Sequence, residues 1–194
     1  MKIKFLKTMF LLALTSSALT SCVGEDDYAI PTVKEYIFTE GFTNNWSDWT
    51  KYSVTGTQVW QLDTQYGNPG SCAKMSGFAN STNNINEDWL ISPVIDLTNE
   101  TSAILSFQTA SKFSGNLLEI KISNNFSGDN PNDATWTDLS AVLDTDTSNY
   151  IWTNSGNIDI SSFLGENVHI AFKYTSTSSA STTWEVDNIK ITKN

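Results

Sequence analysis

Cysteine and histidine are almost absent from this chain of 194 residues, which contains two cysteines and one histidine. Three such side chains are too few for a four-ligand Cys/His zinc site. Cys22 falls at the end of an N-terminal signal described below, so Cys72 has no partner for a disulfide in the rest of the chain. The strand-like neighbours of Cys72 favour a small buried role over a reactive thiol. His169 lies in the middle of an alternating segment, which favours a structural histidine over a catalytic base.

Basic residues are also scarce. The chain has 11 basic and 21 acidic residues and a formal net charge of −10. Three of the lysines lie in the first 21 residues, which hold no acid, so the rest of the chain carries eight basic and 21 acidic residues, a net charge of −13. A surface this acidic repels phosphate backbones, and we therefore expect no nucleic-acid partner.

No apolar run approaches the ~20 residues that a membrane-spanning helix needs. The run Met9–Leu14 follows three lysines and precedes small and polar residues that end at Cys22. This order is typical of a secretory signal peptide. The segment Leu19–Cys22 resembles the bacterial lipobox. We therefore predict that residues 1–21 are a lipoprotein signal peptide and that Cys22 is lipidated and anchors the protein to the outer membrane.

Residues 22–34 are predicted to form a lipidated tether. Acidic residues at 25–27 and a proline at position 31 are typical of a disordered or extended spacer. Acidic residues directly after a lipidated cysteine also resemble the surface-export signals of Bacteroidetes lipoproteins. That interpretation places the protein on the cell surface, whereas a plain stalk leaves the periplasmic face open as well.

Helical periodicity is absent after the signal, and short alternating segments separated by turn residues take its place. We predict strands at 36–40, 59–62, 73–78, 88–97, 105–109, 118–123 and 168–174, with the last two paired. The segment 88–97 contains Pro93 and is predicted to be an edge strand. About nine short strands at this spacing predict one all-β domain over residues 35–194, an antiparallel β-sandwich of the jelly-roll type.

The last predicted strand changes its alternation. Trp184 and Val186 share one parity, while Ile189 and Ile191 share the other. Uninterrupted pairing would place one of these apolar pairs in solvent. An extra residue at Asp187–Asn188 restores the pattern, so we predict a β-bulge there.

Several segments, taken in order, resemble a known family: Phe38–Phe42, Trp49, Trp60, Glu87–Pro93, Ile120–Ser123, Trp136–Leu139, Ile158–Ile160, Leu164–Phe172 and Val186–Ile189. They are similar to the cleaved-adhesin or choice-of-anchor J domains of Bacteroidetes, which include modules attached to gingipain proteases. The resemblance implies a MAM-like, galactose-binding-like jelly roll that is not itself catalytic. It also implies a structural calcium between the first and last strands.

The calcium ligands implied by the resemblance are Glu40 and Asp187, joined by Asn188 where relatives often carry a second acid. Calcium takes six to eight oxygen ligands and accepts carboxylate, amide and backbone oxygens. A bulge at Asp187 would free a carbonyl and could turn the carboxylate inward. The alternative is that the two acids are exposed or paired with lysines.

Catalytic signatures are missing from the sequence. It has no G-x-S-x-G elbow, no H-E-x-x-H pair and no phosphate-binding glycine loop. Asp144 and Asp146 are interpreted as parts of a solvated loop rather than as a catalytic carboxylate pair. We expect a binding protein and not an enzyme.

Tryptophans offer the remaining clue to a ligand. Trp46 and Trp49 flank a polar turn, while Trp136 and Trp152 follow polar loops. An exposed indole offers a flat apolar face to a sugar ring, but large rings also fill sandwich cores. Two functions therefore stand: a lipid-anchored adhesion module for a protein or glycan ligand at the cell surface, or a carbohydrate-binding lipoprotein that uses these tryptophans.

Overall fold

The computed structural model describes residues 34–43 and 46–193. Residues Lys34–Asn194 form one compact unit. The predicted signal peptide, Cys22 and all but the last residue of the predicted tether lie outside the described residues and stay predictions. Over the described ranges, no helix has the length and hydropathy of a membrane span.

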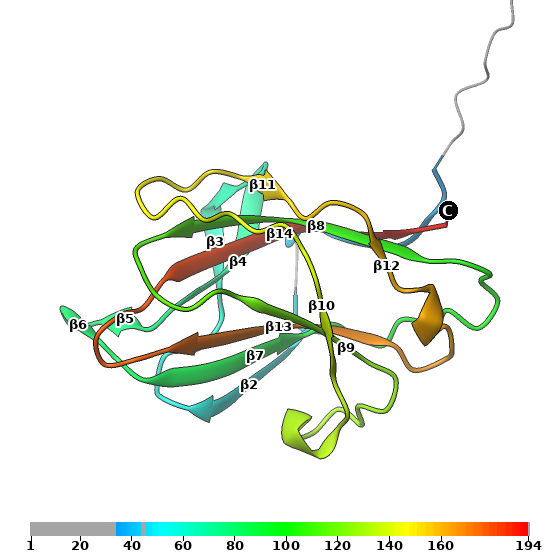
Figure 1. Cartoon of the computed structure of the whole chain (residues 1–194), viewed down its shortest axis with the longest axis horizontal. Helices are drawn as coiled ribbons and strands as arrows, with labels where there is room; N and C mark the ends of the chain where they lie inside the picture. Colours follow the sequence, from blue (N-terminus) through cyan, green and yellow to red (C-terminus); the bar gives the residue numbers. More distant parts are fainter. Residues whose placement is uncertain (1–33, 44–45, 194) are drawn as a thin grey trace, which may run out of the picture. The chain divides into compact units, whose positions relative to one another are not determined.

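Two antiparallel sheets and a short hairpin build the unit (Figure 1). The larger sheet has the order β11-β8-β14-β4-β3, with β1 beside β14 and β12 beside β8. Its strands are β1 (Tyr36–Glu40), β3 (Gln61–Gly67), β4 (Gly70–Ser76), β8 (Ile104–Lys112), β11 (Thr153–Asn154), β12 (Ile158–Asp159) and β14 (Thr183–Thr192).

The smaller sheet has the order β10-β9-β13-β7-β2. Its strands are β2 (Thr50–Thr55), β7 (Asn86–Ile91), β9 (Glu119–Ser123), β10 (Thr137–Leu139) and β13 (His169–Ser176). The hairpin is formed by β5 (Phe78–Ala79) and β6 (Thr82–Asn83), and the helical elements of the described chain are two 3-10 turns, η1 (Pro131–Asp133) and η2 (Ser161–Phe163). The all-β, antiparallel sandwich expected from the sequence is confirmed.

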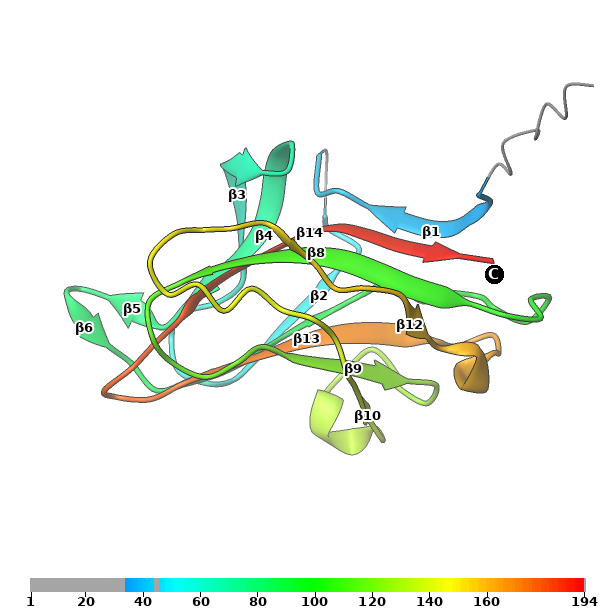
Figure 2. The same ribbon diagram turned by 45° about the horizontal axis from the view of Figure 1, so that its top comes forward.

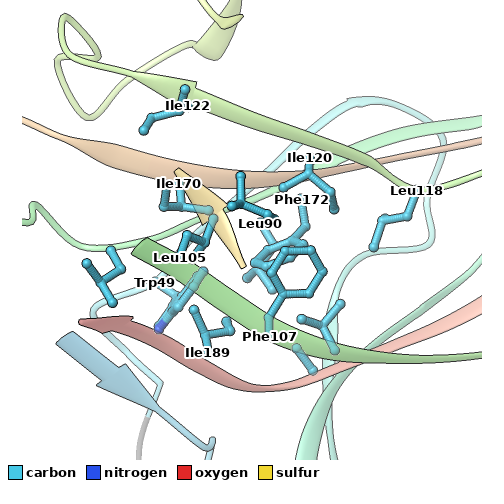
Figure 3. Close-up of a cluster of buried hydrophobic side chains, with 14 of the residues drawn as sticks. Trp49, Leu90, Leu105, Phe107, Leu118, Ile120, Ile122, Ile170, Phe172 and Ile189 are labelled. Atoms are coloured by element: carbon cyan, nitrogen blue, oxygen red, sulfur yellow. The ribbon is translucent and has the colours of Figure 1, made fainter. Parts of the chain in front are cut away.

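The core lies between the two sheets, where alternate side chains from both meet (Figure 3). Phe107 of β8 and Phe172 of β13 touch edge to face, with ring centroids 5.2 Å apart. Trp49 packs beside them, with its ring 6.4 Å from that of Phe172. These contacts join the sheets through large rings, whose burial stabilises the sandwich.

The strand predictions succeed where alternation is clean. β1 has the predicted bounds, and β9 pairs with β13 as expected. The edge-strand prediction for 88–97 is wrong: β7 ends at Ile91 and lies between β13 and β2. Both faces of β7 are covered, with Leu90 in the main core and Trp89 in a second cluster, so its sequence is apolar at both parities.

The predicted bulge is confirmed. The pairing of β14 with β8 shifts register between Asp187 and Lys190, and Asn188 has a positive φ of 52°. On its other side, β14 pairs with β4 before the bulge and with β1 after it. The bulge therefore lies where the strand changes partner, and it turns Asp187 and Asn188 toward the β3–β4 hairpin.

Candidate functional site

The residues implied as calcium ligands lie close together. Asp187 is 1% exposed, and a Cβ on Gly41, the residue after Glu40, would lie 3.9 Å from Asp187 Oδ1. Burial raises the pKa of Asp187, and the nearby Glu40 charge raises it further. A buried carboxyl beside a second acid is an environment that a cation would stabilise.

Hydrogen bonds already engage all four carboxylate oxygens. The Glu40 oxygens accept from Phe42 N (2.5 Å) and Trp49 Nε1 (3.0 Å). The Asp187 oxygens accept from Asn68 N (2.7 Å) and Asn188 N (2.6 Å). The described residues include no group of three His, Cys, Asp or Glu side chains that could hold a metal. The two acids therefore fit part of a calcium donor set, and backbone or amide oxygens would have to supply the rest.

The four predicted tryptophans do not form one surface. Trp49 is 3% exposed and lies in the core, so its face cannot meet a ligand. Trp46 is half-buried against Phe42, with Lys51 Nζ 4.3 Å from the centroid of its ring. Trp136 packs on Trp89, at 5.3 Å between centroids, on the outer side of the smaller sheet. Trp152 lines a cavity on the outer side of the larger sheet.

That cavity, here called the aromatic pocket, has a volume of about 370 Å³ and is lined by Tyr66, Lys74, Tyr150, Trp152 and Glu185. Tyr66 is 61% exposed at the end of β3, and Tyr150 and Trp152 come from the connection between β10 and β11. Figure 2 shows the β3–β4 hairpin bending away from the smaller sheet. Aromatic side chains thus come from two separate segments.

An ion-paired lysine joins the pocket to the sheet. Lys74 Nζ lies 2.9 Å from Asp63 Oδ2 and 3.4 Å from Glu185 Oε1. The same ammonium lies 5.6 Å from the ring centroid of Tyr66 and 5.9 Å from that of Tyr150. This cation is therefore shared by two carboxylates and two aromatic rings.

Glu185 is the unusual group of this pocket. It is 1% exposed, and within the described residues its Oε2 atom is buried without a hydrogen-bond partner. Burial raises the pKa of Glu185, and the ammonium of Lys74 opposes this only in part. A buried acceptor without a donor is costly, so this oxygen lowers the stability of the fold.

Cys72 lies behind the pocket. Its thiol is free and fully buried, and burial together with the charge of Glu185 raises its pKa. A thiol held in its neutral form is unreactive. The buried role expected for Cys72 is therefore confirmed.

Asp144 fixes the segment that carries Tyr150 and Trp152, and its interpretation as a residue of a solvated loop is wrong. Asp144 is 4% exposed. Its Oδ2 accepts from Ser111 N at 2.6 Å and from Ile151 N at 3.4 Å, and its Oδ1 accepts from Asp146 N at 3.0 Å. These bonds tie the connection to β8, which the aspartate-rich sequence by itself does not indicate.

A second cavity, here called the amide pocket, lies further along the same strands and has a volume of about 340 Å³. Gln108 is its centre: Gln108 Oε1 accepts from Asn68 Nδ2 (3.0 Å) and Asn188 Nδ2 (2.8 Å), and Gln108 Nε2 donates to Asn154 Oδ1 (2.8 Å). Asn188 Nδ2 also donates to the backbone oxygen of Asn68. Lys190 is the one charged side chain in its lining.

Sequence reasoning missed Tyr66, Tyr150 and Glu185. Tyr66 directly precedes the turn-forming residues 67–70, where an aromatic at a hairpin tip is a weak signal of exposure. Glu185 lies between two buried residues of β14 and is paired with Lys74 of the neighbouring strand β4. No local pattern shows that pairing.

Comparisons with known proteins agree with this fold. The model of the family described as "Domain of unknown function (DUF5017)" matches residues 94–194. No curated protein matches the chain in sequence.

Among solved structures, two adhesin domains are similar. They are the K1 and K3 cleaved adhesin domains of Lys-gingipain from Porphyromonas gingivalis W83. K1 has a TM-score of 0.55 at 16% identity, with 81% of this chain and 98% of that chain covered. K3 has a TM-score of 0.57 at 14% identity, with 84% and 100% covered.

A carbohydrate-binding domain is similar as well. The family 11 carbohydrate-binding module from Clostridium thermocellum, solved in complex with a β-1,3-1,4-mixed-linked tetrasaccharide, has a TM-score of 0.50 at 16% identity, with 82% and 98% covered. At these identities the likeness concerns the fold. It confirms the jelly roll. The resemblance to cleaved-adhesin domains is supported at the level of architecture.

Proposed function

We propose that this chain, which belongs to the DUF5017 family, is a non-catalytic binding module whose ligand is a carbohydrate. The observation that carries the proposal is the aromatic pocket. Tyr66, Tyr150 and Trp152 line a cavity that also contains Lys74 and the buried Glu185.

The chemistry of this pocket matches a sugar ring. The C–H face of a pyranose packs on aromatic rings, which contribute apolar contact at small entropic cost. Its hydroxyls need both donors and acceptors. Lys74 can donate, and the hydroxyl of the exposed Tyr66 can donate or accept. Because Lys74 holds Asp63 and Glu185 as ion-pair partners, we assign these acids to binding rather than to hydrolysis.

The proposed setting is the cell envelope. Lipidation of Cys22 would hold the pocket at the outer membrane, and the acidic residues after it favour the outer surface. The adhesion function inferred from the sequence then becomes attachment to glycans.

The test is a glycan array followed by calorimetry, using the full chain with Cys22→Ser so that it stays unlipidated. We expect a saccharide ligand whose affinity falls at least about tenfold in Tyr66→Ala, because the variant loses the apolar contact between ring and sugar; tenfold corresponds to about 1.4 kcal/mol. Phe78→Ala is the matched control, because Phe78 is similarly exposed (53%) but lies outside the pocket.

Three outcomes would contradict the proposal. They are binding to host-matrix proteins stripped of glycans with no saccharide ligand, equal losses in Tyr66→Ala and Phe78→Ala, and cleavage of the bound oligosaccharide on prolonged incubation. The first would favour a protein-binding adhesin.

We also propose that calcium binds between Glu40 and Asp187. With two acidic ligands the affinity should lie in the weak range of extracellular modules, about 10⁻⁴–10⁻³ M. Calcium at ten times its dissociation constant would then stabilise the fold by about 1.4 kcal/mol. The melting temperature of the chelator-treated protein should rise with calcium, and Asp187→Asn should abolish the rise. An unchanged melting temperature in the parent would remove this site.

A further inference from the structure

We propose that the aromatic pocket and the amide pocket are neighbouring subsites of one cleft, and that the amide pocket selects a sugar carrying a carboxylate, so that the ligand is an acidic oligosaccharide. This inference rests on the proposed function. It adds the class of saccharide and the residue that recognises it.

Strand register places the two pockets side by side. Glu185 of the aromatic pocket faces Ala110 on β8, and two residues along β14, Asp187 faces Gln108 of the amide pocket. Across β8, Asn154 is also opposite Gln108. A step of two residues along a strand is about 7 Å and returns to the same face. One linear saccharide of two or three rings can therefore reach both cavities.

Two segments of the chain each line both pockets. The β3–β4 hairpin places Tyr66 in the aromatic pocket and Asn68 in the amide pocket. The opposite segment does the same with Trp152 and Asn154. Because these pairs are two residues apart in sequence, a ligand between the two segments would meet rings first and amides next.

The amide network fixes which groups remain for a ligand. Gln108 Oε1 accepts from two N–H donors, and Gln108 Nε2 donates to Asn154 Oδ1. That last bond turns the amino group of Asn154 away from Gln108. An exposed donor is therefore left on the rim of the cavity.

Lys190 supplies the charge. It is half-buried, and among the described residues it forms no ion pair. Tyr36 lies beside it, with its ring centroid 5.9 Å from Nζ. Asp187, whose charge interacts with that of Lys190, has both oxygens engaged by backbone N–H groups. Lys190 and Asn154 thus present donors to the cavity, and no acidic side chain lines it.

The two subsites differ in their chemistry. In the aromatic pocket, the rings of Tyr66, Tyr150 and Trp152 suit the apolar face of a neutral sugar, and Lys74 is a donor for its hydroxyls. In the amide pocket, an ammonium and an amide N–H need an acceptor, and a carboxylate is the strongest one that a sugar carries. A uronic acid next to a neutral ring meets both requirements.

The experiment compares uronic-acid oligosaccharides with their carboxyl-reduced forms. Fragments of galacturonan, glucuronan and mannuronan, each with its reduced counterpart, are titrated calorimetrically into the full chain with Cys22→Ser. We expect at least one acidic fragment to bind about tenfold or more tightly than its reduced form, with a preference that weakens as salt rises. Lys190→Gln should remove this preference and Lys190→Arg should retain it. Lys51→Gln, on the other sheet, should leave it unchanged.

The outcomes separate this inference from the proposed function. Equal binding of acidic and reduced fragments, or an acid preference that survives Lys190→Gln, overturns the inference while saccharide binding stands. If no saccharide binds on the array or in calorimetry, the proposed function fails and this inference fails with it.

Discussion

The two outer faces of the sandwich carry similar aromatic residues and use them in opposite ways. On the smaller sheet, Trp89, Phe126 and Trp136 pack on one another, at 5.3 and 5.6 Å between ring centroids. On the larger sheet, Tyr66, Tyr150 and Trp152 line a cavity with a charged lysine and a buried glutamate. One face is a second core, and the other is a candidate binding site.

The covering segments make the difference. On the smaller sheet, the connection between β9 and β10 lays Phe126 and Trp136 onto the strands, and Trp136 Nε1 donates to Pro131 O at 2.8 Å. On the larger sheet, Asp144 ties its connection to β8 through backbone N–H groups. An apolar anchor closes a face, whereas a polar anchor holds a segment beside the face without filling the space. Aromatic content alone therefore does not locate a binding surface.

The largest expected effect follows from disrupting the aromatic cluster on the smaller sheet. Phe126 is 2% exposed, so Phe126→Ala should cost about 3 kcal/mol of unfolding free energy, measured by urea denaturation. Saccharide affinity of the folded variant should stay unchanged, since the cluster lies on the opposite sheet. A loss of affinity at full folding would contradict the separation of the two faces.

The next largest effect is expected from releasing the connection that carries Tyr150 and Trp152 on the larger sheet. Asp144→Ala removes the acceptor for Ser111 N and Ile151 N and should cost about 2 kcal/mol. Saccharide affinity should fall as well, because Tyr150 and Trp152 lose their support. Asp146→Ala is the control, because Asp146 lies in the same connection but accepts from Ser148 N and Asn149 N at exposed positions. Equal effects of the two variants would refute the role given to Asp144.

The smallest effect concerns pH and separates stability from binding at Glu185. Burial raises the pKa of Glu185, so the folded state binds its proton more tightly than the unfolded state does. The charged form therefore destabilises the fold above the raised pKa, and this penalty disappears as the pH falls below the ordinary glutamate value of 4.5.

Glu185→Gln should accordingly stabilise the protein at pH 8 by about 1 kcal/mol, with no gain at pH 4. Saccharide affinity at pH 8 should fall, because Lys74 loses an ion pair that holds its ammonium beside Tyr66 and Tyr150. Urea denaturation at both pH values and calorimetry at pH 8 measure the two effects. A variant that loses stability at pH 8 would show that the ion pair with Lys74 outweighs the burial of the carboxylate.

Much of the fold can be predicted from local pattern. The alternation in Glu119–Ser123 and His169–Ser176 marks two strands, and the parity change at Asp187–Asn188 predicts the bulge correctly. The edge-strand prediction for 88–97 fails because β7 lies between two strands and has both faces covered, which local pattern does not show. β2 gives little apolar signal because it is a mostly exposed edge strand.

The candidate site is less predictable. Of the four tryptophans named from the sequence, Trp152 lines the aromatic pocket, and Trp49 is in the core. Exposure of an aromatic ring depends on what covers it. For Trp136 and Trp152 the covering residues lie on other strands and loops, beyond the reach of local sequence.

The sequence by itself determines the strand-forming alternation, the bulge and the acidic charge, because each follows from the chemistry of neighbouring residues. It also carries the predicted export signal that ends at Cys22. Only the tertiary structure decides that Glu185 Oε2 lacks a donor among the described residues, that Asp144 holds a loop, and that one aromatic face is covered while the other lines a cavity. These depend on contacts between residues far apart in the chain, and burial and electrostatic energies are set by such contacts rather than by sequence neighbours.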